Sequence, residues 1–187
     1  MKTMHRIWKF AVYRYLFPGQ LAFGVFFLNL FGNRTRTRAL LRSLEPCPEG
    51  SLGREIWLLL HSRNLELVPW YERHDLKHVL LGYPPYPPDE MRMQAFMFGN
   101  AGFSLVNTLI FLSFVIWTPE VWPELPYHYR VGQLTRPVGD WDIERFAHRN
   151  LAELRLDIGL EQARRQAAAE WMQFFVGGPA QPPAECA

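Results

Sequence analysis

Apolar residues recur along most of this chain at the three- and four-residue spacing of amphipathic helices, and the alternation typical of strands is scarce. The pattern predicts short helices over residues 34–44, 51–60 and 71–81, separated by turns that contain proline or glycine. Ser51 has a side chain suited to cap the second of these helices, and Gly82 is suited to end the third. The sequence therefore predicts an all-α fold.

The most hydrophobic segment follows a stiff proline-rich loop that ends at Asp89, which is predicted to cap the next helix. No charged residue occurs between Arg92 and Glu120, and residues 95–117 are almost continuously apolar. This length and composition meet the requirement for a membrane span. Polar residues nevertheless recur within the segment, namely Asn100, Ser104, Asn107 and Thr108. We therefore expect the central apolar helix of a single helical domain, with a true membrane span as the alternative.

Three regions differ in composition and define the predicted organisation of the chain. Residues 1–44 are basic and aromatic, and we expect them to form helices that associate with a membrane surface. Residues 45–176 are predicted to form the helical domain with the candidate metal motif, and its last segment, 140–175, is predicted to be helical and amphipathic. Residues 177–187 contain three prolines and are predicted to be a disordered tail.

The charge of the chain is unevenly distributed. Residues 1–44 hold eight of the 20 Lys and Arg residues and none of the 18 Asp and Glu residues, although the whole chain has a net charge of only +2. The basic side chains alternate with aromatic ones, a combination that suits the headgroup region of a membrane. The alternative is an ordinary helix with a solvated basic face. Nothing in the sequence suggests base readout, so we expect no nucleic-acid partner.

The overall composition excludes several classes of protein. Hydrophobic residues make up 49% and aromatic residues 15% of the 187 positions, which is incompatible with an intrinsically disordered chain. Cys47 and Cys186 are too few and too far apart for a disulfide scaffold or a zinc finger. The sequence also lacks a glycine-rich phosphate loop and the elbow motif of a serine nucleophile.

The feature with the clearest chemical meaning is the sequence His74-Asp75-Leu-Lys-His78 on a predicted helix. At about 100° per residue, His78 and Asp75 lie about 40° and 100° from His74, so all three share one face. Two imidazoles one turn apart can bind a divalent metal ion, and Glu90, after eleven intervening residues, can add a carboxylate. A ligand set without sulfur favours zinc, magnesium, manganese or iron. The alternative is a pair of surface histidines that bind no metal.

Three other histidines are predicted to have no part in such a site. His61 lies in an apolar helix and is expected to be packed. His128 directly follows a proline and a tyrosine and is expected in a loop, and His148 is expected to be exposed. These predictions favour the two histidines of the motif as the candidate ligands.

The motif His-Asp-x-x-His, eleven residues and Glu resembles the signature of the coenzyme Q (ubiquinone) biosynthesis protein-four family. In this sequence the motif consists of His74, Asp75, His78 and Glu90. Residues 78–83 (HVLLGY), the segment 48–55 ahead of the motif and the segment 140–160 are also similar to the family. The resemblance covers roughly residues 45–160.

The resemblance implies an all-α protein attached peripherally to a membrane, at the cytoplasmic face in a bacterium or the matrix face of the inner mitochondrial membrane in a eukaryote. It implies homodimers that hold an isoprenoid lipid between apolar helices, and association with other quinone-synthesis enzymes. It also implies a divalent metal ion, with zinc as the expected ion, bound by His74, Asp75, His78 and Glu90. No catalytic acid or base carries over from the family.

Two functions from different classes are open. The first, implied by the resemblance, is a metal-dependent oxidative decarboxylase of ubiquinone synthesis, which replaces the carboxylate of a prenylated ring precursor by a hydroxyl group. The prenyl tail would lie along residues 95–117 and contact Leu80, Phe96 and Phe103. The second is a non-catalytic scaffold that binds an isoprenoid lipid and organises the quinone-synthesis enzymes. An integral membrane protein of unknown role is a third possibility, based on the uncharged segment alone.

Overall fold

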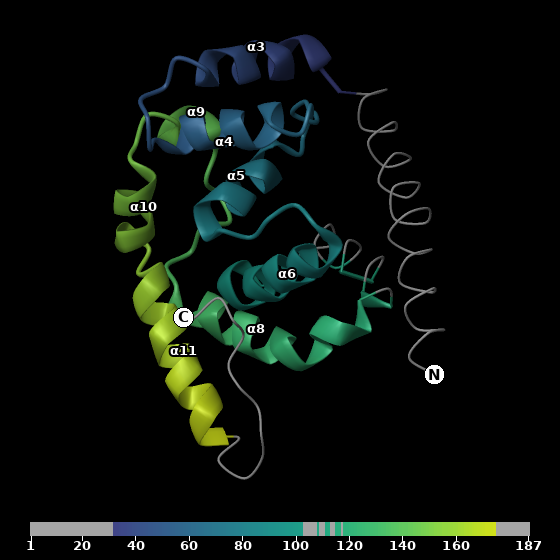
Figure 1. The fold of residues 1–187 in the computed structure, drawn as a ribbon, viewed down its shortest axis with the longest axis vertical. Coiled ribbons are helices and arrows are strands. Elements are labelled where there is room, and N and C mark those ends of the chain that lie inside the picture. Colours follow the sequence, from purple (N-terminus) through teal and green to yellow (C-terminus); the bar gives the residue numbers. More distant parts are fainter. Residues whose placement is uncertain (1–31, 103–107, 109–110, 113–114, 117, 175–187) are drawn as a thin grey trace.

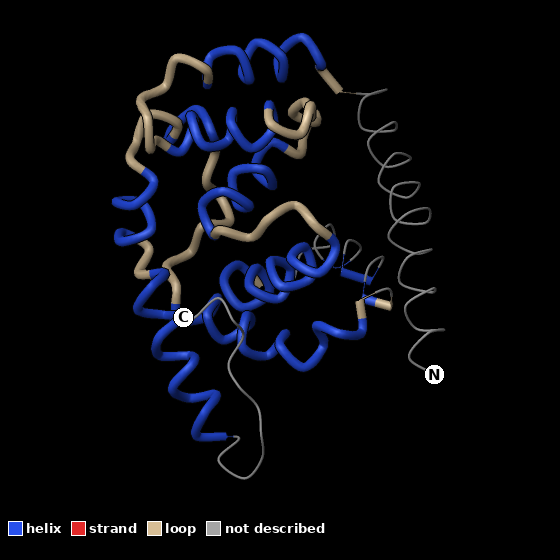
Figure 2. The backbone as a smooth tube through the Cα atoms, in the orientation of Figure 1, coloured by secondary structure: helices blue, strands red, loops and turns tan. Residues whose placement is uncertain are grey.

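The computed structural model describes residues 32–102, 108, 111–112, 115–116 and 118–174. Every regular element within these residues is helical (Figure 2). In chain order they are α3 (Arg34–Leu44), α4 (Leu52–His61), α5 (Glu72–Leu81), α6 (Pro87–Ala101), the 3-10 helix η2 (Pro119–Glu124), α8 (Leu125–Leu134), α9 (Ile143–Phe146), α10 (Leu151–Asp157) and α11 (Leu160–Phe174). Ser51 and Asn150 form an isolated β-bridge. The predicted all-α fold is confirmed.

The helices form two groups with α5 between them (Figure 1). At one end of the molecule α3 packs on α4, and at the other end α6 packs on α8. α5 contacts α4, α6, α9 and α10, while α11 runs along one side and packs on α8. The junction between α5 and α6 therefore lies where the two groups meet, and both parts of the candidate metal motif are located there.

One hydrophobic core joins residues from the first described helix to the last. Leu44 of α3, Leu76 of α5, Phe96 of α6 and Leu160 of α11 are all buried in it. Because Leu44 belongs to this core, the described part of the predicted membrane-associating region packs on the domain. The rest of that region, residues 1–31, and the predicted tail lie outside the described residues.

Several helix boundaries predicted from local sequence are confirmed. The segment 34–44 is a helix with the predicted bounds. Ser51 caps α4, since its side chain accepts a hydrogen bond from the Arg54 N–H. Gly82 ends α5 in the left-handed conformation, with a φ of 75°, which glycine adopts without the steric penalty of a Cβ atom.

The helix that carries Glu90 differs from its prediction at both ends. It begins at Pro87, after Tyr86, and not after Asp89, because the fixed φ of a proline suits the first helical position. It ends at Ala101, followed by Gly102 with a φ of 75°, and so does not continue unbroken to residue 117. Within the described part of the chain, no helix has the length and apolar character needed to cross a membrane.

The helical character predicted for the segment 140–175 is confirmed over its described residues, but they do not form one continuous helix. The structure has three helices there, α9, α10 and α11. Asn150 interrupts the segment because its side chain accepts hydrogen bonds from the N–H groups of Ala152 and Glu153 and thereby starts α10. Gly159 interrupts it again with a φ of 72° between α10 and α11. The apolar periodicity continues across both breaks, which is why the pattern alone did not locate them.

α6 and α8 approach each other so closely that their backbones touch. A Cβ atom on Gly99 would collide with the Tyr129 carbonyl oxygen, and one on Gly132 would collide with the Phe96 carbonyl oxygen. Next to this crossing, the side-chain N–H groups of Asn100 donate to carbonyl oxygens at and just after the end of α8, those of Gly132, Thr135 and Arg136. The side-chain oxygen of Asn100 accepts a hydrogen bond from the Val138 N–H at 2.9 Å. The position of α6, and hence of Glu90, is therefore held in part by α8.

Candidate metal centre

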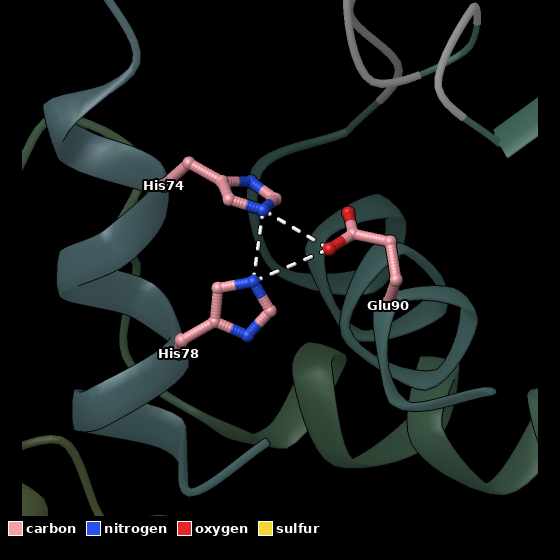
Figure 3. Close-up of side chains that lie close together, drawn as sticks. All are labelled: His74, His78 and Glu90. Atoms are coloured by element: carbon pink, nitrogen blue, oxygen red, sulfur yellow. Dashed lines mark hydrogen bonds and ion pairs between the residues drawn. The ribbon is translucent and has the colours of Figure 1, made fainter. Parts of the chain in front are cut away.

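Two helices bring three ligand atoms together at the junction between α5 and α6 (Figure 3). His74 and His78 project from successive turns of α5, and Glu90 projects from the first turns of α6. The Oε2 atom of Glu90 lies 3.0 Å from Nε2 of His74 and 3.2 Å from Nε2 of His78. The two Nε2 atoms are 2.9 Å apart. All three atoms thus face a common point.

This geometry fits a divalent ion. A tetrahedral zinc ion with bonds of about 2.0–2.1 Å holds its ligand atoms roughly 3.3 Å from one another. The three observed separations, 2.9, 3.0 and 3.2 Å, are slightly shorter, so a small outward movement would admit the ion. Two imidazoles and one carboxylate also leave coordination positions for water or a substrate.

The charges at the site favour a cation. His78 and Glu90 are 4% and 8% exposed. Burial opposes ionisation of Glu90, but the charges and hydrogen bonds of His74 and His78 outweigh it and hold the pKa of this carboxyl well below its usual range. Burial likewise opposes protonation of His78, but its hydrogen bond to Glu90 and the Glu90 charge raise the pKa of the imidazole. The buried carboxylate is therefore kept ionised by positive charge on the imidazoles, and a divalent cation bound between the three groups would take the place of those protons.

Each of the three ligands has a neighbour that orients it, and the sequence analysis identified none of these neighbours. The Nδ1–H of His78 donates to the Tyr83 carbonyl oxygen at 2.8 Å, which leaves the lone pair of Nε2 for a metal. The Gln94 amide donates to Oε1 of Glu90 at 2.7 Å, which leaves Oε2 toward the histidines. The Tyr71 ring stacks on His74 with centroids 4.1 Å apart. Tyr71 and Gln94 lie one helical turn from their partners, so this spacing was a signal available in the sequence.

Asp75, the fourth predicted ligand, does not belong to this group of converging atoms. It follows His74 directly, and successive helical side chains differ in direction by about 100°. Burial raises the pKa of Asp75 to about 6, although the charges of both histidines oppose the shift. The structure therefore brings three of the four predicted ligands together, and direct coordination by Asp75 stays a prediction.

The C-terminal end of α5 is held by two arginines from other helices. Arg155 of α10 donates to the carbonyl oxygens of Val79 and Leu80 at 2.9 and 3.0 Å. Arg164 of α11 donates to the Leu81 carbonyl oxygen at 2.7 Å. These carbonyl groups have no partner within their own helix, so the arginines complete the helix end and favour it electrostatically. They fix the turn of α5 that carries His78.

No family model matches this chain, and no curated protein sequence does either. Among solved structures it is similar to one from Nostoc punctiforme PCC 73102 that bears the name "putative ubiquinone biosynthesis protein". The TM-score is 0.52 at 21% sequence identity, over 64% of this chain and 67% of the Nostoc chain. The two chains share a fold.

Two of the three residues predicted to contact a prenyl tail lie in the described part of the chain. Leu80 and Phe96 are fully buried in the hydrophobic core, where both pack against other side chains. Phe103 lies outside the described residues. Contact of these residues with a lipid therefore stays a prediction.

Three further histidines, His61, His128 and His148, differ from one another more than the sequence predicted. His148 is exposed, as expected. His61 is exposed as well, contrary to the prediction, and stacks on Trp57 with centroids 4.4 Å apart. His128 is not in a loop: it lies on α8 and is 1% exposed, with Nδ1 2.8 Å from the Tyr83 hydroxyl oxygen. The helix over 125–134 places it in the interior.

His128 is expected to make the fold sensitive to acid. Its burial, together with the charges of Arg92 and Arg164, lowers its pKa from 6.5 to about 3. Below pH 6.5 the unfolded chain binds a proton at this residue, while the folded chain does not until about pH 3. As the pH is lowered through that window, the free energy of unfolding falls by about 1.4 kcal/mol per pH unit because of this residue.

Chemical denaturation at a series of pH values, with a chelator present throughout, measures this dependence. The variant His128→Leu has no group to titrate at this position, so its stability should fall less steeply between about pH 6.5 and pH 4. Equal slopes for the wild type and the variant would contradict the prediction.

Proposed function

We propose that this chain is a metal-dependent protein of ubiquinone biosynthesis that replaces the carboxylate of a prenylated ring precursor by a hydroxyl group. The observation that carries the proposal is the convergence of His74, His78 and Glu90 on one point. Two further observations support it: the resemblance of the motif to the signature of the ubiquinone biosynthesis protein-four family, and the fold shared with the Nostoc protein. His74, His78 and Glu90 would hold the ion, with zinc as the expected identity.

The arrangement of the chain's own residues suits this chemistry. When bound, a divalent ion would supply a Lewis acid that can polarise the carboxylate of the ring or activate water or oxygen. Glu90 would compensate part of the positive charge, and the Tyr83 carbonyl would keep the proton of His78 on Nδ1. The net reaction releases carbon dioxide and is a two-electron oxidation of the ring, so it requires an oxidant such as dioxygen.

A membrane face is the proposed location, cytoplasmic in a bacterium or facing the matrix in a mitochondrion. Three arginines of α3 already pair with acidic residues of the domain. Arg34 and Arg38 pair with Glu66 at 3.0 and 3.2 Å, and Arg36 pairs with Glu144 at 2.9 Å. We therefore propose that residues 1–31, with their basic and aromatic side chains, make the membrane contact. A homodimer, an isoprenoid lipid and other quinone-synthesis enzymes are the proposed partners.

A non-catalytic scaffold is the second candidate, and one observation favours it. The ligands join α5 to α6 across a short loop, and two of the three are buried. An ion held there would also fix this junction, as structural zinc sites do. In this alternative the protein binds the lipid and organises the enzymes, and the metal only stabilises its fold.

Metal analysis of the purified protein tests the site itself. We expect about one divalent ion per chain, and we expect His74→Ala and His78→Ala to lose it, because two ligands do not retain the ion tightly. His61→Ala, at an exposed histidine of α4, is the matched control and should keep the ion. A protein whose two ligand variants contain as much metal as the wild type would contradict the proposal.

A further inference from the structure

We propose that Tyr83 and His128 form a positioning pair, whose hydrogen bond couples the metal ligand His78 to helix α8. This inference rests on the proposed metal binding and extends it to residues that touch no ligand atom of the site. Tyr83 lies in the loop between α5 and α6, directly after the glycine that ends α5. Its backbone and its side chain make two different contacts, and these connect two parts of the molecule.

The backbone of Tyr83 contacts the metal site. Its carbonyl oxygen accepts the Nδ1–H of His78 at 2.8 Å, so the position of this carbonyl sets the rotation of the imidazole and its tautomer. A shift of the loop would turn Nε2 of His78 away from the point that it shares with His74 and Glu90.

The side chain of Tyr83 contacts α8. Its hydroxyl oxygen lies 2.8 Å from Nδ1 of His128, and the two rings meet edge to face with centroids 5.4 Å apart. Tyr83 is 2% exposed and His128 1% exposed, so this hydrogen bond is made in the interior, where water cannot replace it.

These contacts form a closed path around the metal site. From His78 the path runs through Tyr83 to His128 on α8, and α8 packs against the backbone of α6 at Gly99 and Gly132. α6 in turn carries Glu90, whose carboxylate faces His78 at 3.2 Å. The Tyr83–His128 hydrogen bond therefore ties the loop that orients one ligand to the helix that positions another.

A role in packing alone does not account for His128. Its Nε2 atom is buried and has no hydrogen-bond partner among the described residues. An unsatisfied buried nitrogen destabilises a fold, and a leucine of similar volume would avoid this cost. If His128 only filled space, its replacement by leucine should cost neither stability nor zinc affinity. If it is a positioning residue, the replacement should weaken zinc binding.

The experiment measures zinc affinity by competition with a chelator, together with the absorption spectrum of the cobalt-substituted protein. Tyr83→Phe keeps the ring but removes the hydroxyl group, and His128→Leu removes its partner. Each is expected to weaken zinc binding about tenfold, as loss of an outer ligand-orienting contact does, and to shift the cobalt bands. The double variant should be no weaker than either single variant, because both remove the same interaction.

Two more variants separate positioning from general destabilisation. His128→Asn places an amide near the position of Nδ1 and should restore most of the affinity. Thr135→Val removes the buried hydroxyl of the residue that follows α8, which donates to the Val131 carbonyl oxygen at 2.7 Å, and it should leave zinc affinity and the cobalt spectrum unchanged. Thermal unfolding of the metal-free proteins reports stability separately from metal affinity.

The outcomes distinguish the failure of this inference from that of the proposed function. A wild type that binds neither zinc nor cobalt would overturn both. A wild type that binds zinc, with Tyr83→Phe and His128→Leu binding it equally well, would overturn the positioning pair alone. Additive losses in the double variant would also overturn it, since the two residues would then act independently.

Discussion

Glu90→Gln is expected to remove tight metal binding while leaving the protein folded. Glutamine has nearly the same size, and its carbonyl oxygen can still accept the hydrogen bond from Gln94. The substitution nevertheless removes the only negative charge among the three converging ligands. Because Glu90 contributes a ligand atom, the loss of affinity should exceed the roughly 10- to 100-fold that loss of an outer contact costs.

The same variant decides between the enzyme and the scaffold. We expect the wild type, but not Glu90→Gln, to complement a strain blocked at ring decarboxylation, because turnover needs the charge and the open positions of the metal site. Glu153→Gln makes the same chemical change in the first turn of α10, far along the chain from the motif, and should complement fully. Equal complementation by the wild type and Glu90→Gln would favour the scaffold. Failure of the wild type itself would contradict the proposed substrate.

Gly132→Ala is expected to destabilise the domain severely. The added methyl group would collide with the carbonyl oxygen of Phe96, and this is a backbone atom that cannot turn away as a side chain can. α6 and α8 would have to separate, at a cost of about 3 kcal/mol or more in the free energy of unfolding. For a domain of this size the melting temperature should fall by about 6–12 °C.

Thermal unfolding of the metal-free protein measures this effect. Gln133→Ala, at the exposed neighbouring position on α8, is the matched control and should change the free energy of unfolding by less than about 0.5 kcal/mol. If Gly132→Ala melted within a degree or two of the wild type, the close approach of the two backbones would be contradicted. Because α6 carries Glu90, the variant should bind zinc more weakly as well.

The boundaries that sequence reasoning predicted well depend on contacts within a few residues. Ser51 caps α4 through the N–H three residues later, and Gly82 ends α5 through its own backbone conformation. Interruptions of the same local kind were missed where the apolar periodicity continued past them. Asn150 and Gly159 divide the predicted C-terminal helical segment in this way.

The residues around the candidate ligands show the limit of sequence reasoning more clearly. Gln94 and Tyr71 lie one turn from their partners, so helical spacing could have indicated them. Tyr83 and His128 are 45 positions apart, and no periodicity relates them. Their contact exists because α8 packs on α6. This crossing depends on Gly99 and Gly132, and the sequence does not show that the two glycines lie at the point where the backbones touch.

The sequence by itself determined the all-α class, the helix over 34–44 and the pair His74 and His78, since two side chains one turn apart share a face wherever the helix packs. It also indicated Glu90, through the spacing of a motif. Only the tertiary structure decided which atoms converge. It placed Oε2 of Glu90 against both imidazoles and left Asp75 outside the group, because the approach of α6 to α5 is set by their packing and by the loop between them.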